Sequence, residues 1–149
     1  MEKPRVLLVD DNEATCTLII ALLHNEFVVE IANDGQEAIE KLKSRQYAAI
    51  LLDLLMPVVD GYAVLDYLQQ HHPEILSRVI AVTASLSNRE MKRLQGYAIC
   101  GLIAKPFEVD VLQAAVRQCA GLGGDVFLRG PLLSGGMLLL LAEMLRRVQ

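Results

Sequence analysis

Two kinds of segment alternate along the first 119 residues. Short, almost unbroken apolar runs are followed by longer stretches in which apolar residues recur every three or four positions. The short runs are typical of buried strands, and the longer spacing is typical of amphipathic helices. The expected strands are residues 5–10, 27–32, 48–53, 78–83 and 100–104.

A helix is expected after each strand. Asp34 and Ser87 each precede a helical stretch and have a glutamate three residues later, the spacing of a capping box. The expected helices are residues 12–25, a stretch that begins after residue 34, and residues 62–71, 87–97 and 108–119. Five strand–helix repeats predict an α/β fold with a parallel sheet and right-handed crossovers.

Polar side chains stand at the ends of four of the five expected strands. Asp10 and Asp11 end the first strand, Asp53 the third and Thr83 the fourth, and Lys105 follows the fifth. The carboxyl ends of parallel strands meet at one edge of an open sheet, where functional loops collect. These five side chains are therefore expected to form one site.

The residue types at this edge suit phosphoryl chemistry. Converging carboxylates favour Mg²⁺, which prefers oxygen ligands and often bridges to a phosphate. Lys105 supplies a positive charge for phosphoryl oxygens, and the hydroxyl of Thr83 can donate to one of them. Asp53 is the expected nucleophile, because a carboxylate can carry a phosphoryl group as an acyl phosphate.

Four motifs, in this order, resemble the receiver domain of the response regulators of two-component systems. They are VLLVDDN at the first strand, DLLMPVVDG around Asp53, VTA at Thr83 and AKPF at Lys105. The resemblance covers residues 4–120 and implies a chemotaxis-regulator-like, flavodoxin-like (βα)5 doubly wound sheet with strand order 2-1-3-4-5. It also implies a cis peptide bond before Pro106.

The resemblance implies a role for each candidate residue. Asp53 would accept a phosphoryl group from a phosphohistidine of a sensor histidine kinase or histidine phosphotransfer protein. Lys105 would pair with that group, and Thr83 would report it to the face formed by the fourth helix, fifth strand and fifth helix. The implied Mg²⁺ ligands are Asp10, Asp11, Asp53 and the backbone carbonyl of Leu55.

Two positions depart from the usual receiver pattern. Leu102 stands three residues before Lys105, where the family often has Tyr or Phe as a partner of the threonine. The aromatic part of the switch is therefore in question. Leu55 stands where a polar residue is common, and we expect its apolar side chain to hinder the attacking water and lengthen the phosphorylated lifetime.

Other functions of the same residues fit less well. A phosphatase of the haloacid dehalogenase type would need D-x-D with its nucleophile on the first strand, where this chain has adjacent Asp10 and Asp11. A flavodoxin-like FMN site would need an uncharged phosphate loop there. A degenerate receiver that serves only as a protein-interaction module stays an alternative. The leading prediction is a phosphorylated signalling switch and not an enzyme.

Composition and charge limit the partners, the location and the cysteine chemistry that are expected for this protein. The 149 residues carry a net charge of −4, which argues against direct binding to nucleic acid. No apolar stretch approaches the roughly 20 residues that span a bilayer, so a cytoplasmic protein without a membrane contact is expected. No two of the three cysteines, Cys16, Cys100 and Cys119, have the C-x-x-C spacing. All three are therefore expected to be buried thiols without a disulfide.

Residues 121–149 differ from the rest of the chain. Residues 121–136 are rich in glycine, which predicts a flexible connector. Residues 137–149 are largely apolar and are a candidate amphipathic helix. Three alternatives are open: packing on this domain or a second copy, continuation into a longer protein, or disorder; ordered packing is favoured. This tail and the face formed by the fourth helix, fifth strand and fifth helix are candidate surfaces for a homodimer.

Overall fold

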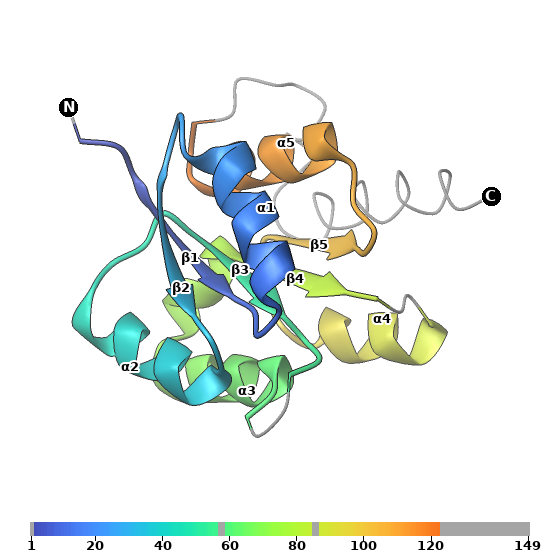
Figure 1. Ribbon diagram of the computed structural model, residues 1–149. Helices are drawn as coiled ribbons and strands as arrows, with labels where there is room; N and C mark the ends of the chain where they lie inside the picture. Colours follow the sequence, from blue (N-terminus) through green and yellow to red (C-terminus); the bar gives the residue numbers. More distant parts are fainter. Residues whose placement is uncertain (1, 57–58, 85–86, 123–149) are drawn as a thin grey trace.

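Five parallel strands form the centre of the computed structural model (Figure 1). The structure describes residues 2–56, 59–84 and 87–122, and the statements below concern these residues. The strand order is β2-β1-β3-β4-β5, as the resemblance to receiver domains predicted. The chain therefore has the flavodoxin-like (βα)5 fold.

The boundaries of the elements agree closely with the apolar pattern. The strands are β1 (Arg5–Val9), β2 (Val28–Ala32), β3 (Ala49–Asp53), β4 (Val79–Thr83) and β5 (Gly101–Ala104). The helices are α1 (Glu13–Leu23), α2 (Gly35–Ser44), α3 (Gly61–His71), α4 (Asn88–Gln95) and α5 (Val109–Cys119). A short 3₁₀ helix, η1 (Pro73–Arg78), was not predicted; it begins at a proline, which suits a first helical position.

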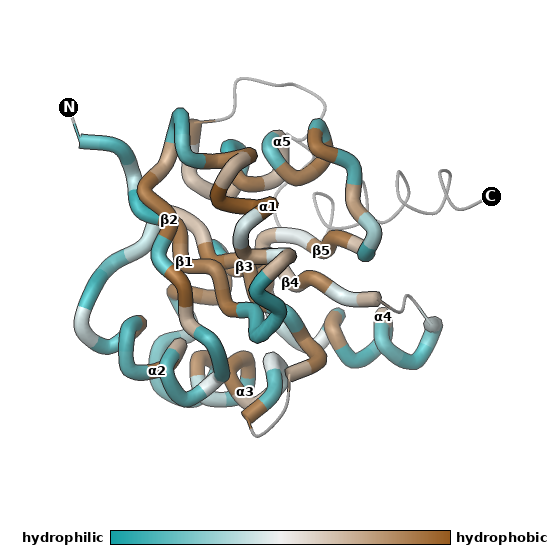
Figure 2. Tube along the Cα trace, viewed as in Figure 1, coloured by the Kyte–Doolittle hydropathy of each residue, from teal (hydrophilic) through white to brown (hydrophobic). Residues whose placement is uncertain are grey.

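Helices cover both faces of the sheet, with α1 and α5 on one face and α2, α3 and α4 on the other (Figure 1). Successive residues of β1 face opposite layers: Val6 and Leu8 pack with α1 and α5, whereas Leu7 and Val9 join the other core. The strands are almost continuously hydrophobic (Figure 2) because both of their faces are buried.

Side-chain caps fix where most of the helices begin. Asp34 accepts a hydrogen bond from the backbone N–H of Glu37, and Ser87 accepts one from that of Glu90, so both predicted caps are confirmed. Asp60 caps α3 through the N–H of Ala63 at 2.9 Å. These caps set the start of each helix just beyond the carboxyl edge of the sheet, where the candidate site lies.

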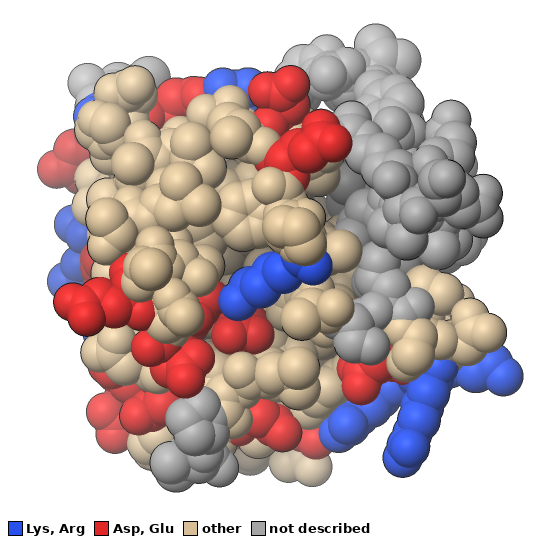
Figure 3. Space-filling view, turned by 45° about the vertical axis from the view of Figure 1, so that its right-hand side comes forward, with Lys and Arg blue, Asp and Glu red and all other residues tan. Residues whose placement is uncertain are grey.

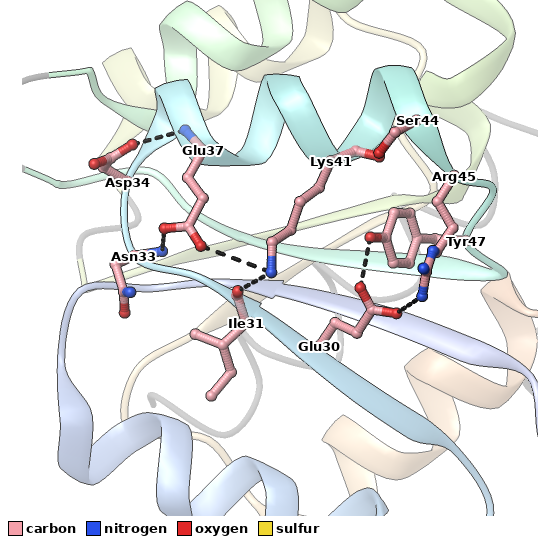
Figure 4. A network of polar contacts seen from close by, with 9 residues as sticks. All are labelled: Glu30, Ile31, Asn33, Asp34, Glu37, Lys41, Ser44, Arg45 and Tyr47. Carbon is pink, nitrogen blue, oxygen red and sulfur yellow. Dashed lines mark hydrogen bonds and ion pairs between the residues drawn. The ribbon is translucent and has the colours of Figure 1, made fainter.

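An ion-pair cluster joins β2 to its neighbours on the outer side of the sheet (Figure 4). The Glu30 carboxylate accepts hydrogen bonds from Arg5 and Arg45, both at 2.7 Å, and from the hydroxyl of Tyr47 at 2.9 Å. Burial alone raises the pKa of Glu30, but these three donors outweigh it and the net pKa is lowered. The Glu30 carboxylate therefore stabilises the fold by linking β2 to these three residues.

The expectation that all three cysteines are unpaired thiols is wrong. Cys100 and Cys119 form a disulfide, with their Cα atoms 6.1 Å apart, whereas Cys16 is a buried free thiol as expected. The pairing follows from the fold: α5 runs back along β5, so its last residue returns to the residue that precedes this strand (Figure 1). A separation of 19 residues without a recognisable motif gave no indication of this contact.

The expectations for the tail fall mainly on residues 123–149, which lie outside the described part of the chain. The connector and helix expected there stay predictions. Among the residues that the structure describes, no helix has both the length and the apolar character needed to cross a membrane.

Candidate functional site

The predicted site residues lie at the carboxyl edge of the sheet. Asp53 is the last residue of β3, and Asp10 directly follows β1. The two strands are neighbours and pair in register up to Val9 and Leu52. Asp10 and Asp53 are both buried, whereas Asp11 is exposed.

The three carboxylates form one acidic cluster. Asp10, Asp11 and Asp53 each have an oxygen atom within 4.8 Å of the others, a spacing that could hold a metal ion. Three negative charges this close repel one another, and two of them are shielded from water. A hard divalent cation with oxygen preference fits both the ligand type and the charge.

Lys105 ties the cluster to the fifth strand. Its Nζ atom lies 3.1 Å from Oδ2 of Asp10 and 3.5 Å from Oδ2 of Asp53. Burial lowers the pKa of Lys105, but its bonds and charge contacts with Asp10 and Asp53 outweigh this and the net pKa is raised. The ammonium group is therefore charged and lies between two buried carboxylates. The Lys105–Pro106 peptide bond is cis, as predicted.

The environment of Asp53 disfavours its ionised form. Burial raises the pKa of this carboxyl, and the nearby charge of Asp10 adds to the effect. The backbone N–H of Leu55, which donates to Oδ1 at 3.1 Å, and the charge of Lys105 oppose the shift, but the net pKa is raised. A further positive charge beside Asp53 would therefore stabilise its ionised form.

Thr83 and Leu55 complete the predicted set. Thr83 is buried at the end of β4, and its carbonyl accepts a hydrogen bond from the N–H of Lys105 at 2.8 Å. Leu55 has 59% of its surface exposed beside Asp53. Leu102, in place of the usual aromatic residue, is fully buried in the core beneath α4.

Gly61 brings the start of α3 against the end of β3. A Cβ atom at this position would lie 2.7 Å from Cα of Leu54 and still closer to the carbonyl oxygen of Asp53. Gly61 N–H also donates to the carbonyl of Leu54 at 3.2 Å. Only glycine allows this approach without displacing the backbone that carries Asp53. A glycine that directly follows a capping aspartate is a signal in the sequence that could have indicated this contact.

Contacts between α3 and α4, which the sequence analysis missed, adjoin this site. The hydroxyl of Tyr62, the residue after Gly61, donates to the Glu90 carboxylate, and the guanidinium of Arg93 stacks 3.6 Å from the centre of its ring. Further along, the Tyr97 hydroxyl donates to Asp66. Aromatic side chains thus join α3 to α4 and to the segment after it, although β5 contains no aromatic residue.

The surface over this region is divided by charge. Figure 3 shows acidic side chains in groups mainly over the left and lower part of the face, with basic side chains projecting at the lower right, where α4 lies. Arg89, Lys92 and Arg93 of α4 are exposed.

Sequence comparison agrees with this geometry. The family model of the response regulator receiver domain matches residues 6–117. The chain belongs to this family. As a receiver domain of two-component systems, it has the fold and the strand-end residues that the four sequence motifs predicted.

Relatives of the receiver domain include parts of much longer kinases. The signal transduction histidine-protein kinase BarA of Escherichia coli strain K12 is 35% identical over 108 residues, which is 72% of this chain but only 12% of that protein. The receiver domain therefore spans about an eighth of this curated relative.

Solved receiver domains share the whole fold. The receiver domain of the sensor histidine kinase PA1611 from Pseudomonas aeruginosa PAO1, with a magnesium ion coordinated in its active-site cleft, is 28% identical with a TM-score of 0.72. The match covers 80% of this chain and 99% of that domain. The receiver domain of the Francisella response regulator 1452 is 28% identical, with a TM-score of 0.70 and coverage of 80% and 98%.

Proposed function

We propose that Asp53 is the phosphoryl acceptor of this receiver domain and that the donor is a phosphohistidine on a sensor histidine kinase or histidine phosphotransfer protein. One observation carries the proposal. Three carboxylates from two neighbouring strands converge, and the ammonium of Lys105 bridges Asp10 and Asp53. Such an arrangement is costly to the fold. A divalent metal ion would offset its negative charge, and the metal ion together with Lys105 could then hold a phosphoryl group on Asp53.

The proposed transfer forms one bond and breaks one. A carboxylate oxygen of Asp53 attacks the phosphorus atom, the bond from phosphorus to the imidazole nitrogen breaks, and the histidine leaves as neutral imidazole after protonation. The product is an acyl phosphate on Asp53. Lys105 stays beside the phosphoryl oxygens and stabilises their charge, and the Thr83 hydroxyl donates to one of them.

Mg²⁺ is the metal that the ligand set fits best. Asp10, Asp11, Asp53 and the backbone carbonyl of Leu55 would hold it, with Asp10 acting directly or through water. All four ligands are hard oxygen atoms, and the exposed position of Asp11 leaves the site open to solvent. When bound, the ion lowers the repulsion between the acidic cluster and an incoming phosphoryl group.

A shallow pocket beside Lys105 supports a protein donor. It is lined by Thr15 and Leu18 of α1 and by Lys105, Pro106 and Phe107. Leu18 is half exposed there, and an apolar side chain at the rim of a charged site suits contact with a partner helix. A histidine carried on such a helix would approach Asp53 past Lys105.

The receiver domain is proposed to act as a signalling switch and not as an enzyme. The shared family supports this assignment over a haloacid-dehalogenase-type phosphatase, whose nucleophile would stand on β1 instead of at Asp53. The complete set of acids, threonine and lysine supports it over a degenerate receiver. Sustained turnover of p-nitrophenyl phosphate would instead favour the phosphatase.

The wider setting is proposed from the sequence. We infer a cytoplasmic receiver domain at residues 4–120, followed by a connector and short helix at residues 121–149. The net charge of −4 supports the absence of direct nucleic-acid binding. The α4–β5–α5 face, with its basic residues on α4, and the tail are the candidate surfaces for a homodimer.

The decisive experiment uses a small phosphoryl donor. The full chain is incubated with Mg²⁺ and acetyl phosphate or phosphoramidate, and its intact mass is measured. We expect one added phosphoryl group in the unmodified chain and in Asp110→Asn, a control at an exposed carboxylate of α5, but none in Asp53→Asn. An adduct that persists in Asp53→Asn would overturn the proposal.

A further inference from the structure

Cys100 and Cys119 lie at the two ends of the β5–α5 unit. Cys100 directly precedes β5, and Cys119 is the last residue of α5. Their Cα atoms are 6.1 Å apart, within the range of about 4.4–6.8 Å that a disulfide allows. The backbone therefore needs no rearrangement to hold this pair in either the oxidised or the reduced state.

Both cysteines are partly exposed, in contrast to Cys16. Cys100 and Cys119 pack at the margin of the core between the sheet and α5, whereas Cys16 is buried on α1 with its thiol directed to the carbonyl of Asp10. Small thiols and disulfides reach a partly exposed sulfur far more readily than a buried one. Thiol–disulfide exchange is therefore expected at Cys100 and Cys119 and not at Cys16.

The pair lies at the opposite edge of the sheet from the acidic cluster. Cys100 stands at the start of β5 and Lys105 follows its end, so extended chain of about 16 Å separates them. No residue of the candidate phosphoryl site is within two positions of either cysteine. A change at the cysteines can therefore leave the chemistry of Asp53 unaltered.

We propose that Cys100 and Cys119 are a reversible redox couple, which gives the receiver domain a second site of covalent modification. The co-reactant is a low-molecular-weight disulfide of the glutathione class. One protein thiolate attacks it, its sulfur–sulfur bond breaks, and a mixed disulfide forms as one small thiolate leaves. The second protein thiolate then attacks the mixed disulfide and releases the other small thiolate. The two protons lost by the cysteines pass to the two small thiols.

Oxidation fastens the end of α5 to the start of β5. Other contacts also hold this helix: Arg117 pairs with Glu26, and Gln113 donates to the carbonyl of Leu22 at 3.0 Å. The reduced domain therefore keeps its fold, but the last turn of α5 loses its covalent anchor.

The test counts thiols in the full chain. The protein is equilibrated in glutathione buffers of increasing oxidised-to-reduced ratio, quenched in acid, alkylated with iodoacetamide under denaturing conditions and weighed intact. We expect a transition from three alkyl groups to one, the last on Cys16. Cys16→Ser should undergo the same transition from two groups to none, whereas Cys119→Ser should show no paired loss of two groups.

Three outcomes would overturn the proposal. They are three alkyl groups at every ratio, a disulfide that survives the most reducing buffer, and a doubled mass that reveals pairing between chains. Failure of Asp53 to gain a phosphoryl group would bear only on the proposed function, because the thiol count does not depend on it.

A second readout measures the effect on α5. Reduction should lower the midpoint of thermal unfolding by about 5–10 °C. It should also speed amide hydrogen exchange in residues 109–119 at least several-fold, while labelling of Asp53 by acetyl phosphate stays within about twofold. Equal exchange and equal melting in the two redox states would show that oxidation does not constrain the helix, and would equally overturn the proposal.

Discussion

Two groups of carboxylates in this molecule are held in opposite ways. On the outer side of the sheet, one carboxylate, Glu30, receives hydrogen bonds from Arg5, Arg45 and Tyr47. At the carboxyl edge, three carboxylates converge, and Lys105 is their one ion-pair partner among the described residues. Donors exceed acceptors in the first group, and acids exceed cations in the second.

The difference separates an acid whose charge stabilises the fold from one whose charge costs stability. The donors around Glu30 bring its pKa below the ordinary value, so its charge stabilises the fold at neutral pH. Burial and the neighbouring Asp10 bring the pKa of Asp53 above its ordinary value, so ionised Asp53 costs stability. A buried acid with too few partners marks the place where the molecule can gain most from a ligand.

Removing the cation of the acidic cluster should have the largest effect. In Lys105→Ala, the phosphoryl oxygens lose their fixed positive partner, and we expect the rate of labelling by acetyl phosphate to fall roughly 100-fold. The measurement is a time course of intact mass at saturating Mg²⁺. Lys92→Ala, at an exposed lysine of α4, is the matched control and should label at the normal rate. Equal rates in the two variants would contradict the role of Lys105.

Adding Mg²⁺ should stabilise the domain through the acidic cluster. At about tenfold excess over its dissociation constant, a ligand of the folded state contributes roughly 1.4 kcal/mol. We expect a matching rise in the midpoint of thermal unfolding, absent with EDTA. In Asp53→Asn, stability without metal should rise, because an ionisable buried group is removed, and the response to Mg²⁺ should shrink. An undiminished response there would place the ion elsewhere.

Glu30→Gln should weaken the fold without affecting labelling of Asp53. Loss of the charged acceptor should lower the free energy of unfolding by about 1 kcal/mol at neutral pH. The folded pKa of Glu30 lies below its ordinary value of 4.5, so its stabilisation is present above pH 4.5 and is lost as pH falls through the folded pKa. Urea unfolding of both proteins between pH 7 and pH 3 should show this difference close toward the acid end. If the difference in the free energy of unfolding stayed constant with pH, the loss of stability would come from altered packing and not from the lost charge.

Leu55→Asn should give the smallest effect. Leu55 donates its N–H to Asp53 and exposes its side chain beside it. A polar side chain there should admit the attacking water more easily and speed the loss of the phosphoryl group by several-fold, which is about 1 kcal/mol or less. The measurement is the decay of the phosphorylated mass after removal of the donor. Val28→Asn, at an exposed apolar residue at the start of β2, is the control, and an unchanged decay in Leu55→Asn would refute the effect.

Local patterns were enough to predict most of the fold. Apolar runs located the five strands because both faces of a parallel strand are buried, and Asp34 and Ser87 located two helix starts because capping needs only near neighbours. The convergence of Asp10 with Asp53 followed from strand ends alone. Such features depend on a few consecutive residues, so a single sequence contains their signal.

Long-range side-chain contacts could not be predicted in this way. The cluster at Glu30 and the contact of Tyr62 with Glu90 join residues that are far apart in the chain and carry no motif. The disulfide of Cys100 and Cys119 depends on how far α5 runs back along β5. Each requires the packed arrangement of whole elements, which the hydrophobic pattern fixes only in outline.

The bond between Lys105 and Asp10 also bears on how the protein is made. Its two partners are 95 residues apart, the acid near the start of the chain and the lysine after the last strand. During synthesis from the amino terminus, the acids therefore emerge long before their cation. An incomplete chain that stops at residue 104 carries Asp53 without Lys105, and we expect it to gain no phosphoryl group from acetyl phosphate. We therefore expect phosphorylation only in a nascent chain that has been extended past its fifth strand.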